Sequence, residues 1–382
     1  MSTLFNNIAS LVSNTDAQFA KPAFIVDDGK ISWIGEADSA PAADAQVDLQ
    51  NKTVIPGFVD THAHLLFAGD RAEEFSARMQ GQAYSAGGIK TTVASTREAS
   101  DAQLEANLAR LVAEMHASGI TTFETKSGYG LDVETESRSL AIAAKHTSET
   151  TFLGAHVVPQ EYKDKSDEYV ELVKNQMINA AAPHAKWIDV FCDRGAFNVD
   201  QAREILKAGI KAGLAPRIHA NQLENIGAIQ LAVELDCASA DHCTHLNHDD
   251  IDALANSNTV ATLLPGAEFS TRSQYPDARK LIDAGVTVAL ATDCNPGSSY
   301  TTSMAFCIAL AVREMHMSPA EALWSATMGG AKALRRDDIG HLSLGVRADF
   351  AVINAPSYIH MAYRPGVNLI SDTYIAGRAV TK

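Results

Sequence analysis

A predicted strand and a pair of histidines share one short stretch, Val54-Ile55-Pro56-Gly57-Phe58-Val59-Asp60-Thr61-His62-Ala63-His64. Its first half is apolar and rich in β-branched residues, which predicts a buried β-strand. Residues two apart on a strand point to the same side, so His62 and His64 can direct both imidazoles at one point beyond the strand's end. The stretch therefore predicts half of a metal site.

Downstream of this stretch, apolar segments of strand length alternate with segments of helical periodicity. In the segment 101–118, Leu104, Leu108 and Leu111 form an apolar stripe at helical spacing, and a glycine follows it. Further strands are predicted at residues 120–125, 151–158, 187–191, 216–219, 237–242, 259–264 and 286–293. Eight alternating units over about 250 residues predict an α/β fold, a TIM-like (β/α)8 barrel. A doubly wound open sheet is the alternative, but no G-x-G-x-x-G follows the first strand.

Both ends of the chain are predicted to be rich in β-structure. Near the N-terminus, two apolar runs flank Asp27-Asp28-Gly29-Lys30, and Asp-Gly between such runs is typical of a β-hairpin. Strand-like runs return at residues 351–353 and 369–375. We therefore expect one small β domain built from residues 1–53 and 344–382, and a barrel formed by residues 54–343.

The composition indicates a globular protein and restricts its partners. Of the 382 residues, 46% are apolar and 20% are charged, and the formal net charge is −15. This charge argues against nucleic acids and anionic membrane surfaces as partners, and it means that an anionic substrate needs a local cation. No apolar run approaches the roughly 18 residues of a membrane span, the N-terminus lacks a signal-like pattern, and the cysteines form no C-x-x-C pair. We expect a cytoplasmic protein with free, buried thiols.

The predicted strand ends carry a cluster of histidines and an aspartate. They are His62, His64, His156, His219, His242 and Asp293. A single histidine at such a position is usually a neutral, hydrogen-bonded residue, but several on converging strand ends indicate a metal site, because barrel chemistry lies at the carboxyl ends of the strands. The predicted ligands are His62, His64, His219 and Asp293, a set suited to zinc or iron. His242 then remains for proton transfer or electrostatic stabilisation.

The arrangement of these residues resembles that of the metal-dependent amidohydrolase superfamily. The shared features are the segment Pro56–His64, the histidines that end strands five and six, and the aspartate that ends strand eight. Further motifs make the chain similar to the imidazolonepropionase family. They are residues 64–75, Lys126-Ser127-Gly128-Tyr129-Gly130-Leu131, Gly154-Ala155-His156, Ser239-Ala240-Asp241-His242 and Thr292-Asp293-Cys294-Asn295-Pro296-Gly297-Ser298-Ser299. The resemblance implies that the small domain is a β-sandwich and that each chain holds one metal ion, zinc or iron, and it suggests a homodimer. Strand four ends Phe191-Cys192-Asp193, without the lysine found in two-metal members.

The resemblance also implies a reaction, the hydrolytic ring opening of 4-imidazolone-5-propanoate to N-formimidoyl-L-glutamate in histidine degradation. Asp293 and His242 are the implied catalytic residues. The implied substrate contacts are Arg71, Tyr84, Tyr129, His156, Gln222, Asn295, Gly297 and Ser298. Arg71 suits its role because a guanidinium can bind a carboxylate through two hydrogen bonds.

Two departures from the family pattern restrict these expectations. Gln222 stands where some members carry a glutamate, and because an amide cannot take up a proton, we expect it only to orient the substrate. The segment between Tyr84 and Gly87 is also shorter than usual. Another cyclic amidohydrolase or a nucleobase deaminase on the same scaffold is the alternative function, although a nucleobase has no carboxylate for Arg71. A metal- or ligand-binding barrel without turnover is a further alternative, which would require a degraded site.

Overall fold

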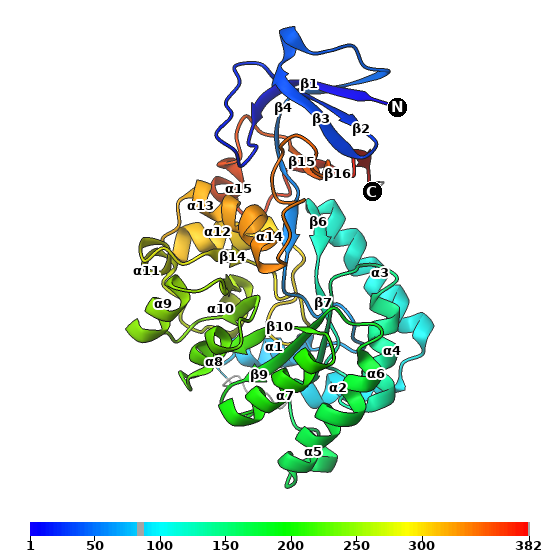
Figure 1. Cartoon of the computed structure of the whole chain (residues 1–382), viewed down its shortest axis with the longest axis vertical. Helices are drawn as coiled ribbons and strands as arrows, with labels where there is room; N and C mark the ends of the chain where they lie inside the picture. Colours follow the sequence, from blue (N-terminus) through cyan, green and yellow to red (C-terminus); the bar gives the residue numbers. More distant parts are fainter. Residues whose placement is uncertain (82–87, 381–382) are drawn as a thin grey trace.

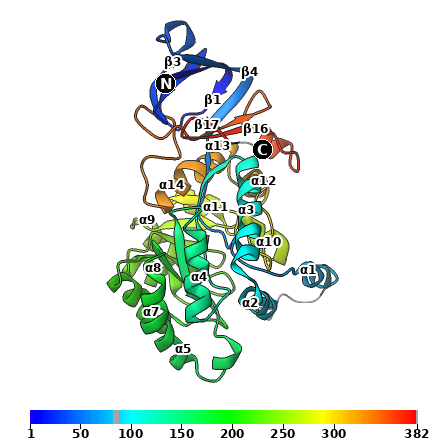
Figure 2. The ribbon, with the colours of Figure 1, turned by 90° about the vertical axis from the view of Figure 1, so that its right-hand side faces the viewer.

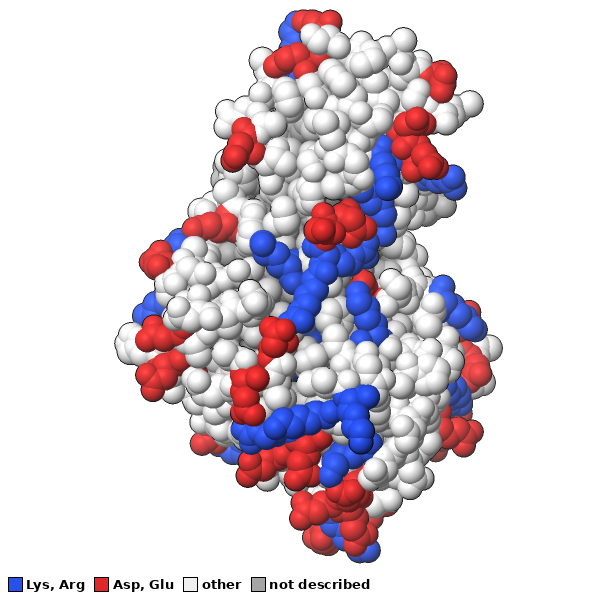
Figure 3. All heavy atoms as spheres, in the orientation of Figure 1, with Lys and Arg blue, Asp and Glu red and all other residues white. Residues whose placement is uncertain are grey.

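A computed structural model describes residues 1–81 and 88–380. The chain forms a β-sheet at one end of an elongated molecule and a larger α/β body at the other (Figures 1 and 2). Among the described residues, no helix is long and apolar enough to cross a membrane. Lys and Arg are interspersed with Asp and Glu over the face shown in Figure 3.

The terminal sheet has seven strands and is assembled from both ends of the chain, in the order β17-β16-β15-β4-β1-β2-β3. Its strands are β1 (Thr3–Leu11), β2 (Pro22–Asp27), β3 (Lys30–Glu36), β4 (Ala45–Pro56), β15 (Phe350–Ile353), β16 (Ile370–Ile375) and β17 (Arg378–Ala379). The predicted hairpin is confirmed, because β2 and β3 pair antiparallel around Asp28 and Gly29, whose φ values of 47° and 73° suit an Asp-Gly turn. The Phe350 and Tyr374 rings stack at 4.4 Å within its core.

The α/β body contains a curled parallel sheet. Its strands are β5 (Phe58–Asp60), β6 (Ile120–Phe123), β7 (Thr125–Lys126), β8 (Thr150–Ala155), β9 (Trp187–Cys192), β10 (Ala215–Pro216), β11 (Ile218–Ala220), β12 (Ser239–His242), β13 (Val260–Leu263) and β14 (Val288–Leu290). All their pairings are parallel, from β7 through β8, β9, β11, β12 and β13 to β14. Strand β5 pairs with β6, and the chain after β5 meets the chain after β14 through His64 N–H to Cys294 O and Asp293 N–H to His62 O, both 2.9 Å. These two hydrogen bonds join the chain after β5 to the chain after β14 at three of the predicted site residues and their neighbour Cys294.

Helices cover the outside of this sheet. They are α1 (Ala72–Met79), α2 (Ile89–Glu98), α3 (Asp101–Ala117), α4 (Val133–Ala143), α5 (Ser166–Leu172), α6 (Ile178–Ala181), α7 (Val199–Lys211), α8 (Ala228–Glu234), α9 (His248–Ala255), α10 (Pro265–Thr271), α11 (Ala278–Asp283), α12 (Met304–Glu314), α13 (Pro319–Trp324), α14 (Gly330–Ala333) and α15 (His360–Tyr363). The predicted stripe of α3 is buried, and Asn198 caps α7 by accepting from the Gln201 N–H. Helices α1, α2, α10 and α15 were not predicted.

The opening stretch differs from its prediction, because it is two strands rather than one. Strand β4 ends at Pro56, which pairs with Phe350 in the terminal sheet, and β5 begins at Phe58 in the parallel sheet. Gly57 lies between them, and a Cβ there would approach the Thr121 Oγ1 to 2.2 Å. A residue without a side chain is therefore required where the chain passes from one sheet to the other.

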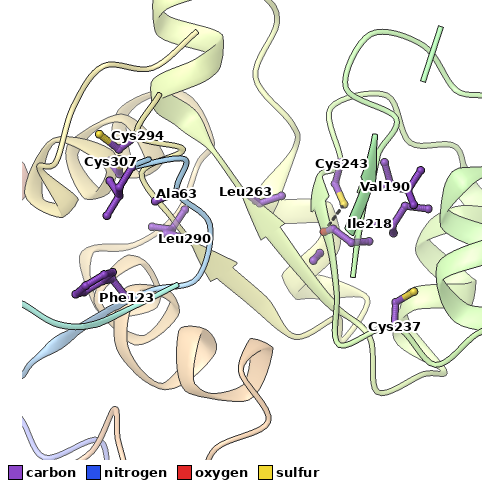
Figure 4. Packing of buried hydrophobic residues seen from close by; sticks show 14 of the residues in the cluster. Ala63, Phe123, Val190, Ile218, Cys237, Cys243, Leu263, Leu290, Cys294 and Cys307 are labelled. Carbon is purple, nitrogen blue, oxygen red and sulfur yellow. Dashed lines mark hydrogen bonds between the residues drawn. The ribbon is translucent and has the colours of Figure 1, made fainter. Parts of the chain in front are cut away.

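Apolar side chains pack densely between the strands and the surrounding helices (Figure 4). All five cysteines are free and buried, as predicted. Among them, the Cys243 thiol donates to the Ala240 carbonyl at 3.2 Å.

Candidate active site

A cavity lies at the carboxyl ends of the parallel strands. Its lining includes most of the predicted site residues, namely His64, Arg71, Tyr129, His156, His219, Gln222, His242, Asp293, Asn295 and Ser298. His62 is fully buried behind this wall, and Gly297 lines an adjoining hollow. Tyr84 and Gly87 fall outside the described residues.

Three histidines form a group able to hold a metal ion. One ring nitrogen from each of His62, His64 and His219 lies within 4.8 Å of the others. The Nε2 atoms of His62 and His64 face each other at 3.3 Å, and the Asp293 Oδ1 lies 3.6 and 3.5 Å from them. The structure thus brings together the four predicted ligands.

The protonation states of His62 and Asp293 suit the binding of a cation. Burial, followed by the charge of Lys126, lowers the pKa of His62 well below its usual range, so its imidazole is neutral. Because a carboxylate can only accept, the His62 Nδ1–H donates to the Asp241 Oδ2 at 2.6 Å, and its Nε2 presents a lone pair. Burial likewise raises the pKa of Asp293 well above its usual range, and a bound cation acts in the opposite direction. The neutral His62 imidazole, whose Nε2 faces His64 and the Asp293 carboxyl group, is therefore a suitable metal donor.

His242 and Asp293 both have backbone dihedrals that are uncommon for residues with a side chain. Their φ values are 78° and 51°, in the left-handed region. Such conformations cost about 1–3 kcal/mol each and gather at functional sites. Burial lowers the pKa of His242 well below its usual range, so this imidazole is neutral and carries one N–H.

His156 and Tyr129 form the wall beside His64. The His156 Nδ1–H donates to the Gly128 carbonyl at 2.9 Å, its ring stacks on His64 at 5.4 Å, and burial lowers its pKa to about 4. The loop carrying Tyr129 is held by Glu136, whose carboxylate accepts from the backbone N–H groups of Gly128, Gly130 and Leu131 at 2.7–3.1 Å. Glu136 was not predicted as a site residue, because a carboxylate in the first turn of a helix is unremarkable until the loop that it binds is known.

The loop after β14 is organised by the Asn295 side chain. Its amide donates to the Asp293 carbonyl at 2.6 Å and to the Ser298 Oγ at 2.9 Å, and its Oδ1 accepts from the Gly297 and Ser298 N–H groups at 2.8 Å. The Ser298 Oγ lies 3.4 Å from the Asp293 Oδ2. Asn295 therefore shapes the turn that carries Asp293, besides lining the cavity.

Arg71 lies at the other end of the cavity, in contact with a carboxylate. Its Nε and Nη2 donate to Glu74 at 2.8 and 2.7 Å, and the Arg78 Nη2 donates to the same carboxylate at 3.0 Å and to the Gly297 carbonyl at 2.9 Å. A Cβ at Gly297 would stand 2.2 Å from the Arg71 Nη1. The structure thus gives Gly297 a role not foreseen from the sequence, since it makes room for the guanidinium.

Gln222 lies in the loop that follows β11 and lines the cavity. Asp193, at the end of β9, accepts from the backbone N–H of the adjacent Leu223 at 2.8 Å. The preceding Asn221 has a φ of 54°. The loop therefore holds the Gln222 amide on the cavity wall.

The chain is similar to proteins of a known family over almost its whole length. The sequence model of the amidohydrolase family matches residues 53–380. Imidazolonepropionase from Streptomyces avermitilis is 59% identical over 399 residues, covering 99% of this chain and 96% of that protein. Imidazolonepropionase from Mycolicibacterium smegmatis is 61% identical over 384 residues, covering 99% of this chain and 97% of that protein. The chain belongs to the imidazolonepropionase family of amidohydrolases.

Solved structures outside the imidazolonepropionase family share the fold. Guanine deaminase from C. acetobutylicum, with bound guanine, is 16% identical with a TM-score of 0.74, and both chains are covered completely. A mutant atrazine chlorohydrolase from Arthrobacter aurescens, complexed with zinc and atraton, is 16% identical with a TM-score of 0.76, covering 99% of this chain and 94% of that one. At this identity the likeness shows a shared architecture alone.

Proposed function

We propose that this chain catalyses the hydrolytic ring opening of 4-imidazolone-5-propanoate to N-formimidoyl-L-glutamate, a step of histidine degradation. The observation that carries the proposal is that one cavity contains a His/Asp metal-binding group and, at its other end, the Arg71 guanidinium. The metal-binding group would act on the ring carbonyl of the substrate, and the guanidinium would bind its propanoate tail. The imidazolonepropionase relatives support the same substrate.

We infer that one zinc or iron ion is held by His62, His64, His219 and Asp293. When bound, such an ion would polarise a carbonyl oxygen and lower the pKa of a coordinated water toward neutrality. The donor set of three imidazoles and one carboxylate suits either metal. The absence of a lysine at the end of β9, where Cys192 and Asp193 stand, supports a single ion.

Proton transfer is assigned to Asp293. Its carboxylate accepts a proton from the attacking water, the water oxygen bonds to the ring carbonyl carbon, and the carbon–nitrogen bond then breaks as Asp293 returns the proton to the departing nitrogen. The burial that raises the pKa of Asp293 suits a group that must first take up and then release a proton. The neutral His242 imidazole donates its N–H to the developing oxyanion.

Substrate orientation is assigned to the remaining cavity wall. Arg71 binds the propanoate carboxylate, and Gly297 leaves space for the guanidinium. Gln222 orients the ring by donating or accepting hydrogen bonds, since it cannot exchange a proton. The other proposed contacts are Tyr84, Tyr129, His156, Asn295 and Ser298.

We also propose the finer architecture and setting. The curled parallel sheet is interpreted as a closed (β/α)8 barrel of residues 54–343, and the terminal sheet as part of a small β-sandwich domain of residues 1–53 and 344–382. The hydrogen bonds between the chain segments after β5 and β14 support closure. The proposed assembly is a homodimer in the cytoplasm, and the net charge of −15 supports the exclusion of nucleic acid and membrane partners.

The decisive experiment combines metal analysis with a substrate assay. Purified chain, with its zinc and iron content measured, is added to 4-imidazolone-5-propanoate, and loss of the imidazolone ultraviolet band is followed together with formation of N-formimidoyl-L-glutamate. Two comparison substrates are used. One is guanine, and the other is an imidazolone that lacks the propanoate group. A full metal complement without ring opening, or release of ammonia from guanine at a higher kcat/KM, would overturn the proposal.

A further inference from the structure

Two of the three clustered histidines are backed by a buried carboxylate. The His62 Nδ1 lies 2.6 Å from the Asp241 Oδ2, and the His219 Nδ1 lies 3.0 Å from the Asp189 Oδ2. Both carboxylate side chains are fully buried. A carboxylate behind an imidazole determines which ring nitrogen is left to face a metal, and it fixes the plane of the ring.

Each of these carboxylates is in turn paired with a buried cation. The Lys126 Nζ lies 2.9 Å from the Asp189 Oδ2 and 3.1 Å from the Glu124 Oε1. The Arg217 Nη2 lies 3.6 Å from the Asp241 Oδ2 and donates to the Thr61 carbonyl at 2.6 Å. Lys126, Glu124 and Arg217 have no solvent-exposed side-chain surface.

The charges of this cluster interact mainly with one another, because none of these side chains is exposed to solvent. Three carboxylates face two cations, and removal of one partner leaves a buried charge uncompensated. His62, Asp189 and Asp241 also present ligand-type atoms within 4.8 Å of one another, as a metal site does. The Lys126 ammonium at 2.9 Å already provides a cation there. These carboxylates are therefore arranged for the histidines in front of them rather than for a second ion.

We propose that Lys126 and Arg217 are positioning residues of the metal centre, and that each holds the carboxylate that orients one metal-binding histidine. Lys126 acts through Asp189 on His219, and Arg217 acts through Asp241 on His62. The inference rests on the proposed metal site, and it adds two residues that touch neither metal nor substrate.

The test measures metal binding rather than turnover. The dissociation constants for Zn²⁺ and Co²⁺ are measured by competition with a chelator for the wild type, Lys126→Met and Arg217→Met, and the visible absorption spectrum of each Co²⁺ form is recorded. We expect each variant to bind about 10- to 100-fold more weakly, the usual effect of losing an outer partner of a metal ligand, and its Co²⁺ spectrum to change. Lys126→Arg and Arg217→Lys, which keep the charge, should recover part of the affinity.

Two controls separate positioning from a general loss of stability. Arg336→Met removes a cation that pairs with the buried Glu149 at 3.5 Å, next to the first residue of β8 and so at the opposite end of the sheet, and it should leave metal affinity unchanged. If Lys126→Met alone does not fold, the double variant Glu124→Gln/Lys126→Met replaces it. This double variant keeps the formal charge of the cluster and should still weaken metal binding. Within a double-mutant cycle, Lys126→Met should add little in an Asp189→Asn background.

The outcomes are distinguishable from failure of the proposed function. If the wild type itself binds neither ion, the metal site and the proposed reaction fail together. If the wild type binds metal while Lys126→Met, Glu124→Gln/Lys126→Met and Arg217→Met keep its affinity and Co²⁺ spectrum, only the positioning role is refuted. An undiminished effect of Lys126→Met in the Asp189→Asn background would refute the route through Asp189.

Discussion

In the part of the cavity that we propose binds the metal, the histidines and the aspartate stand on strands or shortly after them, whereas the part that we propose binds a carboxylate consists of helix α1 and the loop after β14. His62, His219 and Asp293 are buried, and the two histidines have a carboxylate behind them. Arg71 instead depends on Glu74, which is about one-third exposed. The first arrangement is fixed by the strands and their carboxylate partners, while the second is a set of ion pairs that the proposed substrate carboxylate would enter.

The largest effect is expected at the proposed metal-binding end, from Asp293→Asn. The amide preserves the shape of the side chain but cannot accept a proton, so kcat should fall by at least about 10²–10⁴-fold, the usual contribution of general acid–base catalysis. Steady-state kinetics at matched metal content would measure this loss. Asp283→Asn, an exposed residue of α11 paired with Arg279, is the control and should keep the wild-type kcat. A wild-type kcat for Asp293→Asn would remove Asp293 from the mechanism.

A smaller loss is expected for His242→Ala, which removes a hydrogen-bond donor but no proposed ligand. We expect kcat to fall by about 10²–10³-fold, as for loss of one oxyanion donor, while the metal content stays at the wild-type value. Elemental analysis alongside kinetics would check both parts. Loss of the metal from this variant would show that His242 belongs with the metal ligands and not with the catalytic residues alone.

The same contrast explains what the sequence could predict. His62 and His64 were recognisable because strand periodicity alone brings them to one side. Helix α1 was not, because its buried residue is Arg78 while Phe75 is 43% exposed, so no apolar stripe marks its inner face. Glu74 follows Arg71 by three residues and precedes Arg78 by four, so its ion pairs with both arginines follow from helical spacing once α1 is known.

Other parts of the fold were hidden for related reasons. The opening stretch is apolar on both sides of Gly57, so its division between two sheets depends on which partners each half meets in space. Asp189 interrupts an apolar strand, which indicates a buried partner, but the sequence cannot identify Lys126 as that partner. The left-handed conformations of His242 and Asp293 are imposed by surrounding contacts rather than by residue type.

At the carboxylate-binding end, Arg71→Met should affect binding more than turnover. Loss of a charge-assisted hydrogen bond costs about 1.5–3 kcal/mol, so kcat/KM should fall about 10- to 100-fold, mostly through KM. Arg71→Lys should retain part of the affinity, because the charge remains but the paired hydrogen bonds do not. An imidazolone without the propanoate provides the comparison, and an equal loss with that substrate would show that Arg71 does not bind the carboxylate.

The smallest and most informative effect is expected for Glu74→Gln. The Glu74 carboxylate accepts from the Arg71 Nε and Nη2, so it competes with an incoming carboxylate for the same guanidinium. Because a pair of this exposure is worth up to about 1 kcal/mol, removing its charge should lower KM by up to about fivefold with kcat unchanged. Glu73→Gln removes the same charge from an exposed position of the same helix and should leave KM near the wild-type value, which separates local competition from the general field. If Glu74→Gln raises KM instead, Glu74 orients Arg71 rather than competing for it, and this end of the cavity is as dependent on a fixed carboxylate as the histidines are.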